Sequence, residues 1–168
     1  MNIKTGFSKI LVTGPQRSGT RITAKIIAHD NNIKYIDESE IKIRDYTILK
    51  NLLKQDERLV IQCPGICHCI EMFDYPGILI IMVIRDIEDI VKSQERISWG
   101  SKNKERELKL YGKKEGIISK IKYDHWEEQK NQISNWFEIR YDDLKNHPLF
   151  IPKKERKGFE AGQTGENL

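Results

Sequence analysis

The sequence predicts one α/β domain of three layers, in which helices cover both faces of a mainly parallel sheet. Short apolar runs typical of buried strands alternate with helical patterns along the chain. Residues 78–84 are continuously apolar, as a central parallel strand covered on both faces should be. The 168 residues suffice for one domain with its own core, and no repeat or linker divides residues 1–168.

The first half of the chain predicts three strands separated by two helices. Each predicted strand is a short apolar run bounded by turn residues, and each predicted helix carries apolar residues at helical spacing. In chain order these segments are a strand over residues 9–13, a helix over 22–32, a strand over 33–36, a helix over 41–53 and a strand over 58–62.

The second half continues the alternation around the strand over residues 78–84. Pro76 and Gly77 end a short helix before this strand, and Asp86 caps the helix that follows it. The charged residues 100–116 include three glycines, which predicts a loop over part of that stretch. The other segments are predicted helices over 66–73, 86–97, 117–132 and 141–145 and a strand over 136–140.

Composition and charge narrow the class of protein. Hydrophobic residues make up 38% and charged residues 32%, which suits a folded chain rather than a disordered one. The net charge of +4 is mild and spread along the chain, so it favours a small anionic ligand over nucleic acid. Residues 1–9 lack a signal-peptide core, and no apolar run is long enough to cross a bilayer. We therefore expect a cytoplasmic protein with no membrane partner.

The loop between the first strand and the first helix is the strongest candidate for a binding site. Successive backbone N–H groups in such a loop form a nest for an anion, and the helix N-terminus adds partial positive charge. Two glycines allow the tight curve and the close approach of a phosphate, and polar side chains add further donors. The candidate residues are Gly14, Pro15, Gln16, Arg17, Ser18, Gly19, Thr20 and Arg21.

The spacing from Gly14 to Gly19 imitates a Walker A motif, G-x-x-x-x-G-K-[ST]. Thr20 stands at the lysine position, and Arg21 stands at the position of the Mg²⁺-binding hydroxyl. A kinase or ATPase would lack both groups here. An ordinary glycine-containing turn between a strand and a helix is the alternative to a phosphate site.

Gln16-Arg17-Ser18-Gly19-Thr20 resembles the [KR]-S-G-T loop of sulfotransferases. In that family the loop binds the 5′-phosphosulfate of 3′-phosphoadenosine-5′-phosphosulfate (PAPS). The resemblance implies a P-loop fold, PAPS as cofactor and PAP as its desulfated product. It also implies that Arg17 contacts the transferring sulfuryl group and the bridging oxygen, and it implies no metal.

A second segment resembles the element with which sulfotransferases bind the 3′-phosphate. Arg85 ends the central strand, and Ser93 follows eight positions later, about two helical turns away. This spacing resembles R-D-P-x-x-x-x-x-S, with Ile87 in place of the proline. Taken alone, the segment is equally typical of a helix N-cap beside a solvated arginine.

Three shorter segments extend the resemblance along the chain. Arg156-Lys157-Gly158 resembles the R-K-G loop that also binds the 3′-phosphate, although such tripeptides are usually solvated surface runs. Residues 139–144 resemble the strand–turn segment [IV]-R-Y-[ED]-D-L. Residues 60–65 resemble the K-x-P strand end, with Gln62 where a lysine is frequent.

The resemblance implies transfer of a sulfuryl group to a hydroxyl or amine of a small-molecule or glycan acceptor. A general base would take the acceptor's proton. Glu40, and second Glu38, follow the predicted strand where some sulfotransferases keep a catalytic glutamate. Acidic residues at a helix N-terminus explain both equally well. His68 is the rival base, because it follows the third predicted strand.

We expect no metal and no disulfide framework. The cysteines are three in number and clustered, at Cys63, Cys67 and Cys69, and their spacing with His68 matches no common zinc pattern. Two other functions stay open: a P-loop kinase of a nucleotide or small molecule, and a non-catalytic P-loop protein that binds a nucleotide. The sequence does not identify the acceptor or the oligomeric state.

Overall fold

The computed structural model describes residues 2–41, 46–96 and 116–151 and confirms an α/β fold with a central parallel sheet. Five strands lie in the order β2-β3-β1-β4-β5, and every neighbouring pair is parallel. All five strands were expected from the apolar runs. Their bounds are Lys9–Thr13 (β1), Lys34–Ile36 (β2), Leu59–Gln62 (β3), Ile78–Ile84 (β4) and Trp136–Arg140 (β5).

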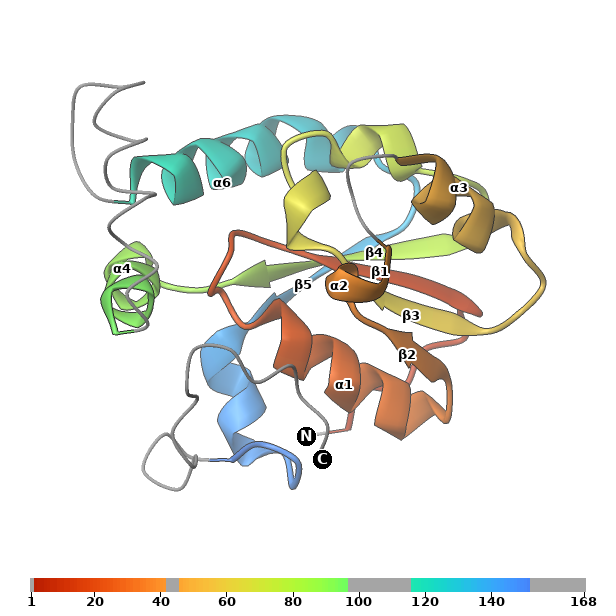
Figure 1. Cartoon of the computed structure of the whole chain (residues 1–168), viewed down its shortest axis with the longest axis horizontal. Helices are drawn as coiled ribbons and strands as arrows, with labels where there is room; N and C mark the ends of the chain where they lie inside the picture. Colours follow the sequence, from red (N-terminus) through yellow and green to blue (C-terminus); the bar gives the residue numbers. More distant parts are fainter. Residues whose placement is uncertain (1, 42–45, 97–115, 152–168) are drawn as a thin grey trace.

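Helices cover the sheet on both faces, which gives three layers (Figure 1). One face carries α3 and α6, the opposite face carries α1 and the turn η4, and α4 lies beyond the carboxyl end of β4. The helices are α1 (Thr20–Asn31), α2 (Glu38–Ile41), α3 (Tyr46–Lys54), α4 (Ile87–Glu95) and α6 (Ile117–Gln129). Short 3₁₀ turns are η1 (Pro64–Ile66), η2 (Ile70–Phe73), η3 (Lys130–Gln132) and η4 (Tyr141–Asn146).

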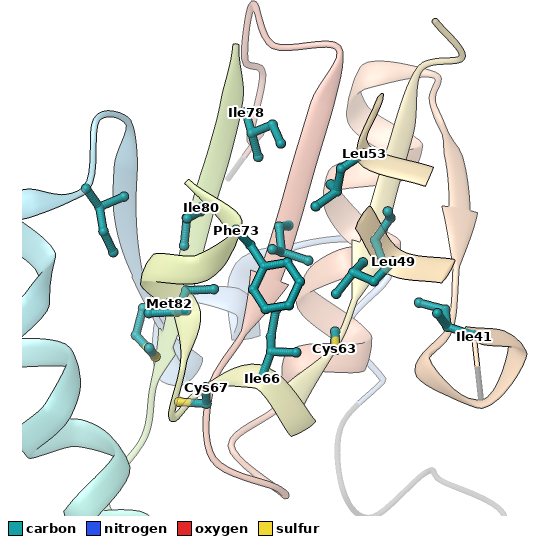
Figure 2. Packing of buried hydrophobic residues seen from close by; sticks show 14 of the residues in the cluster. Ile41, Leu49, Leu53, Cys63, Ile66, Cys67, Phe73, Ile78, Ile80 and Met82 are labelled. Carbon is teal, nitrogen blue, oxygen red and sulfur yellow. The ribbon is translucent and has the colours of Figure 1, made fainter. Parts of the chain in front are cut away.

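Alternate side chains of the strands build two separate cores, because successive residues point to opposite faces of a sheet. Leu11 packs with Leu49 of α3 and Trp126 of α6 in one core, whereas Ile10 packs with Ile27 of α1 in the other. Figure 2 shows the first core, in which Phe73 of η2 lies between β4 and α3. β1 and β3 are buried at every position, as the apolar sequence predicted.

Two predicted helices differ from the structure. The segment 41–53, predicted as one helix, corresponds to the end of α2 at Ile41 and to α3 from Tyr46, with residues 42–45 outside the described part. The segment 66–73 forms 3₁₀ turns instead of one helix. The amides of Cys69 and Met72 donate to carbonyls three residues earlier, and this tighter winding buries both Ile70 and Phe73.

The described helices include none that is both long and apolar enough to cross a membrane.

Candidate functional site

The loop after β1 and the end of β4 meet at one edge of the sheet. β1 and β4 are neighbours in the sheet, with Thr13 paired to Met82, so both strands end side by side. The chain leaves β1 toward β2 on one side and leaves β4 toward β5 on the other side. Ligands in parallel α/β sheets bind where the connections diverge in this way. The predicted loop and Arg85 therefore lie at the position where the fold favours a ligand.

Two glycines give the loop its curve. Gly14 has φ of 151°, and a Cβ there would lie 2.9 Å from the carbonyl oxygen of Val83. Gly19 has φ of 106°, and a Cβ there would lie 2.3 Å from the ring of Tyr141. Arg17 also adopts a left-handed conformation, with φ of 71°, which a residue with a side chain rarely does. The loop is thus held in a specific, partly strained shape.

Arg17 contacts two other predicted site residues from separate elements. The Nε of Arg17 donates to the hydroxyl of Ser93 on α4 at 3.2 Å. A terminal nitrogen of Arg85 donates to the backbone carbonyl of Arg17 at 2.9 Å. The loop, the end of β4 and α4 are therefore joined by the side chains that the sequence motifs singled out.

Within the described residues, the positive charges at this site are not neutralised by nearby acids. In the described part of the chain, no carboxylate forms an ion pair with Arg17 or Arg85. Burial, followed by repulsion from Arg96, Arg85 and Arg21, lowers the pKa of Arg17. An arginine stays protonated despite such a shift, so positive charge accumulates beside the loop.

Two buried donors at the site lack partners in the part of the chain that the structure describes, and an aromatic ring lies against one of them. The hydroxyl of Ser18 and the Nε of Arg85 have no hydrogen-bond partner among the described residues. Arg85 lies over the ring of Tyr141, with the guanidinium carbon 4.2 Å from the ring centre. Buried polar groups are normally paired. Unpaired donors together with excess positive charge fit a polyanionic ligand.

Other residues of the predicted loop form hydrogen bonds or ion pairs with neighbouring residues of the protein. Thr20 accepts a hydrogen bond from the amide of Gln62 at 2.9 Å, and the carbonyl of Pro15 accepts from the amide of Ser18 at 3.0 Å. Arg21 forms a two-point ion pair with Asp37 at 2.8 and 3.2 Å. Although burial opposes the shift, this carboxylate raises the pKa of Arg21. Arg21 is therefore held against α2.

Lys122 of α6 is a site residue that sequence reasoning missed. Its side chain is 7% exposed, and its Nζ donates to Oε1 of Gln16 at 2.5 Å and to the carbonyl of Pro64 at 3.4 Å. A signal did exist, because Lys122 stands four residues before Trp126 and shares its buried helix face. The charged sequence around it looks like a solvated helix.

The candidate bases occupy different surroundings. Glu40 is exposed, and its Oε1 accepts from the amide of Asp37 at 2.8 Å in a capping box that starts α2. Glu38 accepts from the amide of Gly65 at 2.8 Å, and burial raises its pKa although this bond and Lys122 oppose the shift. His68 is largely exposed. Partial loss of its hydration, and then repulsion from Lys122, lower the pKa of its imidazole.

The cysteines and the histidines of the described residues form two groups of possible metal ligands, and their protonation differs. Burial raises the pKa of Cys63 to about 12 and of Cys67 to about 11 in the metal-free protein. A second cluster brings His29, Asp30 and His147 within 4.8 Å of one another. There the amide of Leu149 donates to Nδ1 of His147, so Nε2 carries the proton and donates to Asp30. This tautomer leaves His147 no lone pair for a metal.

Arg156, Lys157 and Gly158 lie outside the described residues, so the structure adds nothing on the predicted R-K-G loop.

The comparisons with known proteins leave the family open. No family model matches the chain, and no curated protein matches it. Among solved structures, the chain is similar to the crystal structure of an uncharacterized protein from Eubacterium ventriosum ATCC 27560. The sequence identity is 14% and the TM-score is 0.46, over 79% of this chain and 89% of that chain.

Proposed function

We propose that the chain binds PAPS at the loop after β1 and acts as a sulfotransferase on a hydroxyl or amine of a small-molecule or glycan acceptor. One observation carries the proposal: Arg17 of the loop motif contacts both Ser93 and Arg85 of the second motif. The unpaired donors on Ser18 and Arg85 support it further, since a ligand with several anionic groups would satisfy them.

The proposed roles follow from position and charge. The loop amides and the N-terminus of α1 bind the 5′-phosphosulfate, and Arg85 and Ser93 bind the 3′-phosphate. PAPS supplies the sulfuryl group when it is bound. Arg17 and the loop amides would stabilise the negative charge that develops on the phosphate side during sulfuryl transfer. Holding the acceptor in line supplies much of the remaining rate enhancement.

Glu38 is the base that we favour for the acceptor's proton. A carboxylate with a raised pKa accepts a proton more readily near neutral pH, and burial gives Glu38 that property. Glu40 is committed to the capping box at the start of α2. His68 stays a third candidate, but its lowered pKa makes it a weaker base.

Thermal unfolding with PAP, with ATP and with ATP plus Mg²⁺ tests the proposal. A ligand that binds only the folded state raises the melting temperature. We expect PAP to stabilise the wild type without metal and the shift to disappear in Arg85→Ala. Arg58→Ala is the matched control, because Arg58 is exposed and precedes β3 at the amino end of the sheet.

The other outcomes distinguish the rival functions. Stabilisation only by ATP with Mg²⁺ would refute the sulfotransferase proposal and favour a kinase. Stabilisation by PAP, without sulfuryl transfer to any acceptor and without slow hydrolysis of PAPS, would favour a non-catalytic nucleotide-binding protein.

A further inference from the structure

A buried lysine faces the loop from the opposite layer of the fold. Lys122 comes from α6, and its ammonium bonds to Gln16 of the loop and to the carbonyl of Pro64 after β3. Gln16 precedes Arg17, the cation that the proposed function places at the sulfuryl group. Lys122 therefore lies beside the anion site, although it is separated from Gln16 by 106 positions in the sequence.

The charge of Lys122 is only weakly compensated. Both of its bonded acceptors are neutral, and no carboxylate of the described chain forms an ion pair with it. A buried ammonium is unfavourable unless it is paired, and burial here lowers the pKa of Lys122, opposed by attraction to acidic groups nearby, Glu38 among them. An anion bound in the loop would provide the missing partner.

The end of β3 does not supply a cation on this side of the loop. Gln62 ends β3, and its neutral amide donates to Thr20 and accepts from the amide of Glu38. Lys122 reaches the space between the loop and the turn η1 that begins at Pro64. It thus provides positive charge from α6 where β3 provides none.

We propose that Lys122 is a ligand-binding cation of this site, which leaves Gln16 on binding and contacts the anion held by the loop. The identity of that anion as the 5′-phosphosulfate rests on the proposed function. Arg17 approaches the anion from the α4 side, where it bonds Ser93, and Lys122 approaches from the side of α6. The two cations would clamp one ligand between two layers of the fold.

The test compares Lys122→Met with the wild type, using inorganic pyrophosphate, PAP and PAPS in calorimetric titrations. Methionine keeps the length of the apolar stem and removes the charge. Loss of a charge-assisted hydrogen bond should weaken pyrophosphate and PAPS binding about tenfold or more. PAP, which lacks the sulfuryl group, should be affected less. Lys122→Arg should recover part of the affinity.

Lys120→Met is the matched control. Lys120 lies on the same helix, is exposed, and pairs with Asp124 of that helix. Its substitution should change the affinities less than twofold, because it removes one charge without touching the loop. An equal loss in both variants would show a general charge effect and overturn the assignment.

A measurement on the wild type covers the case in which Lys122→Met does not fold. Pyrophosphate should slow acetylation of the Lys122 amine, followed by mass spectrometry of peptides, and leave Lys120 unchanged. Acetylation of Lys122 at the same rate with and without pyrophosphate would overturn the proposal.

The outcomes separate this inference from the proposed function. Equal pyrophosphate and PAPS affinities in Lys122→Met and the wild type overturn the role of Lys122, while PAP binding still supports the proposed function. Pyrophosphate binding that depends on Lys122, without any binding of PAP or PAPS, supports the role of Lys122 and refutes the proposed function. No pyrophosphate binding by the wild type overturns the role of Lys122.

Discussion

At the scale of single residues, the loop after β1 depends on positions where only glycine fits. Gly19 combines a left-handed backbone with contact to the ring of Tyr141, and the same ring supports Arg85. A side chain at position 19 would push this ring away and disturb the guanidinium above it. Packing and ligand binding are therefore coupled through Tyr141.

Gly19→Ala should destabilise the protein by roughly 2–4 kcal/mol, because backbone strain adds to a steric overlap. Gly77→Ala is the matched control, since Gly77 has φ of 79° but a Cβ there meets nothing within 4 Å. We expect a smaller loss for it, about 1 kcal/mol, from backbone strain alone. Urea unfolding measures both values, and equal losses would show that the Tyr141 contact adds no strain.

The sequence indicated much of this site but not all of it. Gly14, Gly19 and Arg17 follow from a local motif, and the Arg85–Ser93 spacing follows from one helix. Lys122 and Gln16 are 106 positions apart, and a single sequence does not reveal such a contact. The presence of a cation in the loop motif also does not by itself identify a ligand-binding residue, because Arg21 is paired with Asp37.

At the scale of elements, strands were easier to predict than helices. Continuous apolar runs mark the buried parallel strands, and the side chain of Asp86 caps α4 as expected, at 2.8 Å from the amide of Glu88. The apolar pattern over 41–53 does not mark the start of α2 at Glu38. The capping box from Asp37 to Glu40 starts α2 and was present in the sequence.

The four residues of α2 include two glutamates in different surroundings. Glu38 bonds to the amide of Gly65, Glu40 caps the start of α2, and one variant of each distinguishes their roles. The raised pKa of Glu38 means that its protonation favours folding, and this stability is lost as pH rises through the folded-state pKa. Glu38→Gln imitates the protonated form. It should therefore exceed the wild type in free energy of unfolding at pH 7, with the difference closing below about pH 4.

Glu40→Gln is the matched variant and should behave in the opposite way. It replaces a carboxylate near the N-terminus of α2 by a neutral amide. At pH 7 this should lower the free energy of unfolding by a few tenths of a kcal/mol, about 0.5 at most. Under the proposed function, sulfuryl transfer should be lost in Glu38→Gln and retained in Glu40→Gln, with PAP binding intact in both. The reverse pattern of activity would identify Glu40 as the base.

At the scale of the whole molecule, strand order brings the site residues together. Long-range hydrogen bonds join the N-terminal segment and His147 to α1. Asp30, near the end of α1, accepts from the amide of Ile3 at 2.7 Å and from His147 at 3.1 Å. Asn31 bonds to the same N-terminal segment through Thr5. Residues 117 positions apart are thus joined on the face of α1, opposite to α6.

Asp30 should make the stability of the whole chain depend on acid pH. Although burial opposes the shift, hydrogen bonds from Ile3, His29 and His147 lower the pKa of its carboxyl. A depressed folded-state pKa gives stability that is present above the unfolded pKa, about 3.8–4, and is lost as pH falls through the folded value. Asp30→Asn should therefore be less stable at pH 7, by roughly 1–3 kcal/mol, and lose less stability on acidification.

Urea unfolding at pH 7, 5 and 3, followed by tryptophan fluorescence, measures this linkage. Asp142→Asn is the matched control, because Asp142 is exposed and pairs with Lys145 three residues later, a type of pair that contributes little. We expect the control to follow the wild type at every pH. If Asp30→Asn also did so, the contacts among Ile3, Asp30 and His147 would not limit global unfolding, and the N-terminal segment would be held on α1 by its other contacts, such as the hydrogen bond from the amide of Thr5 to Asn31.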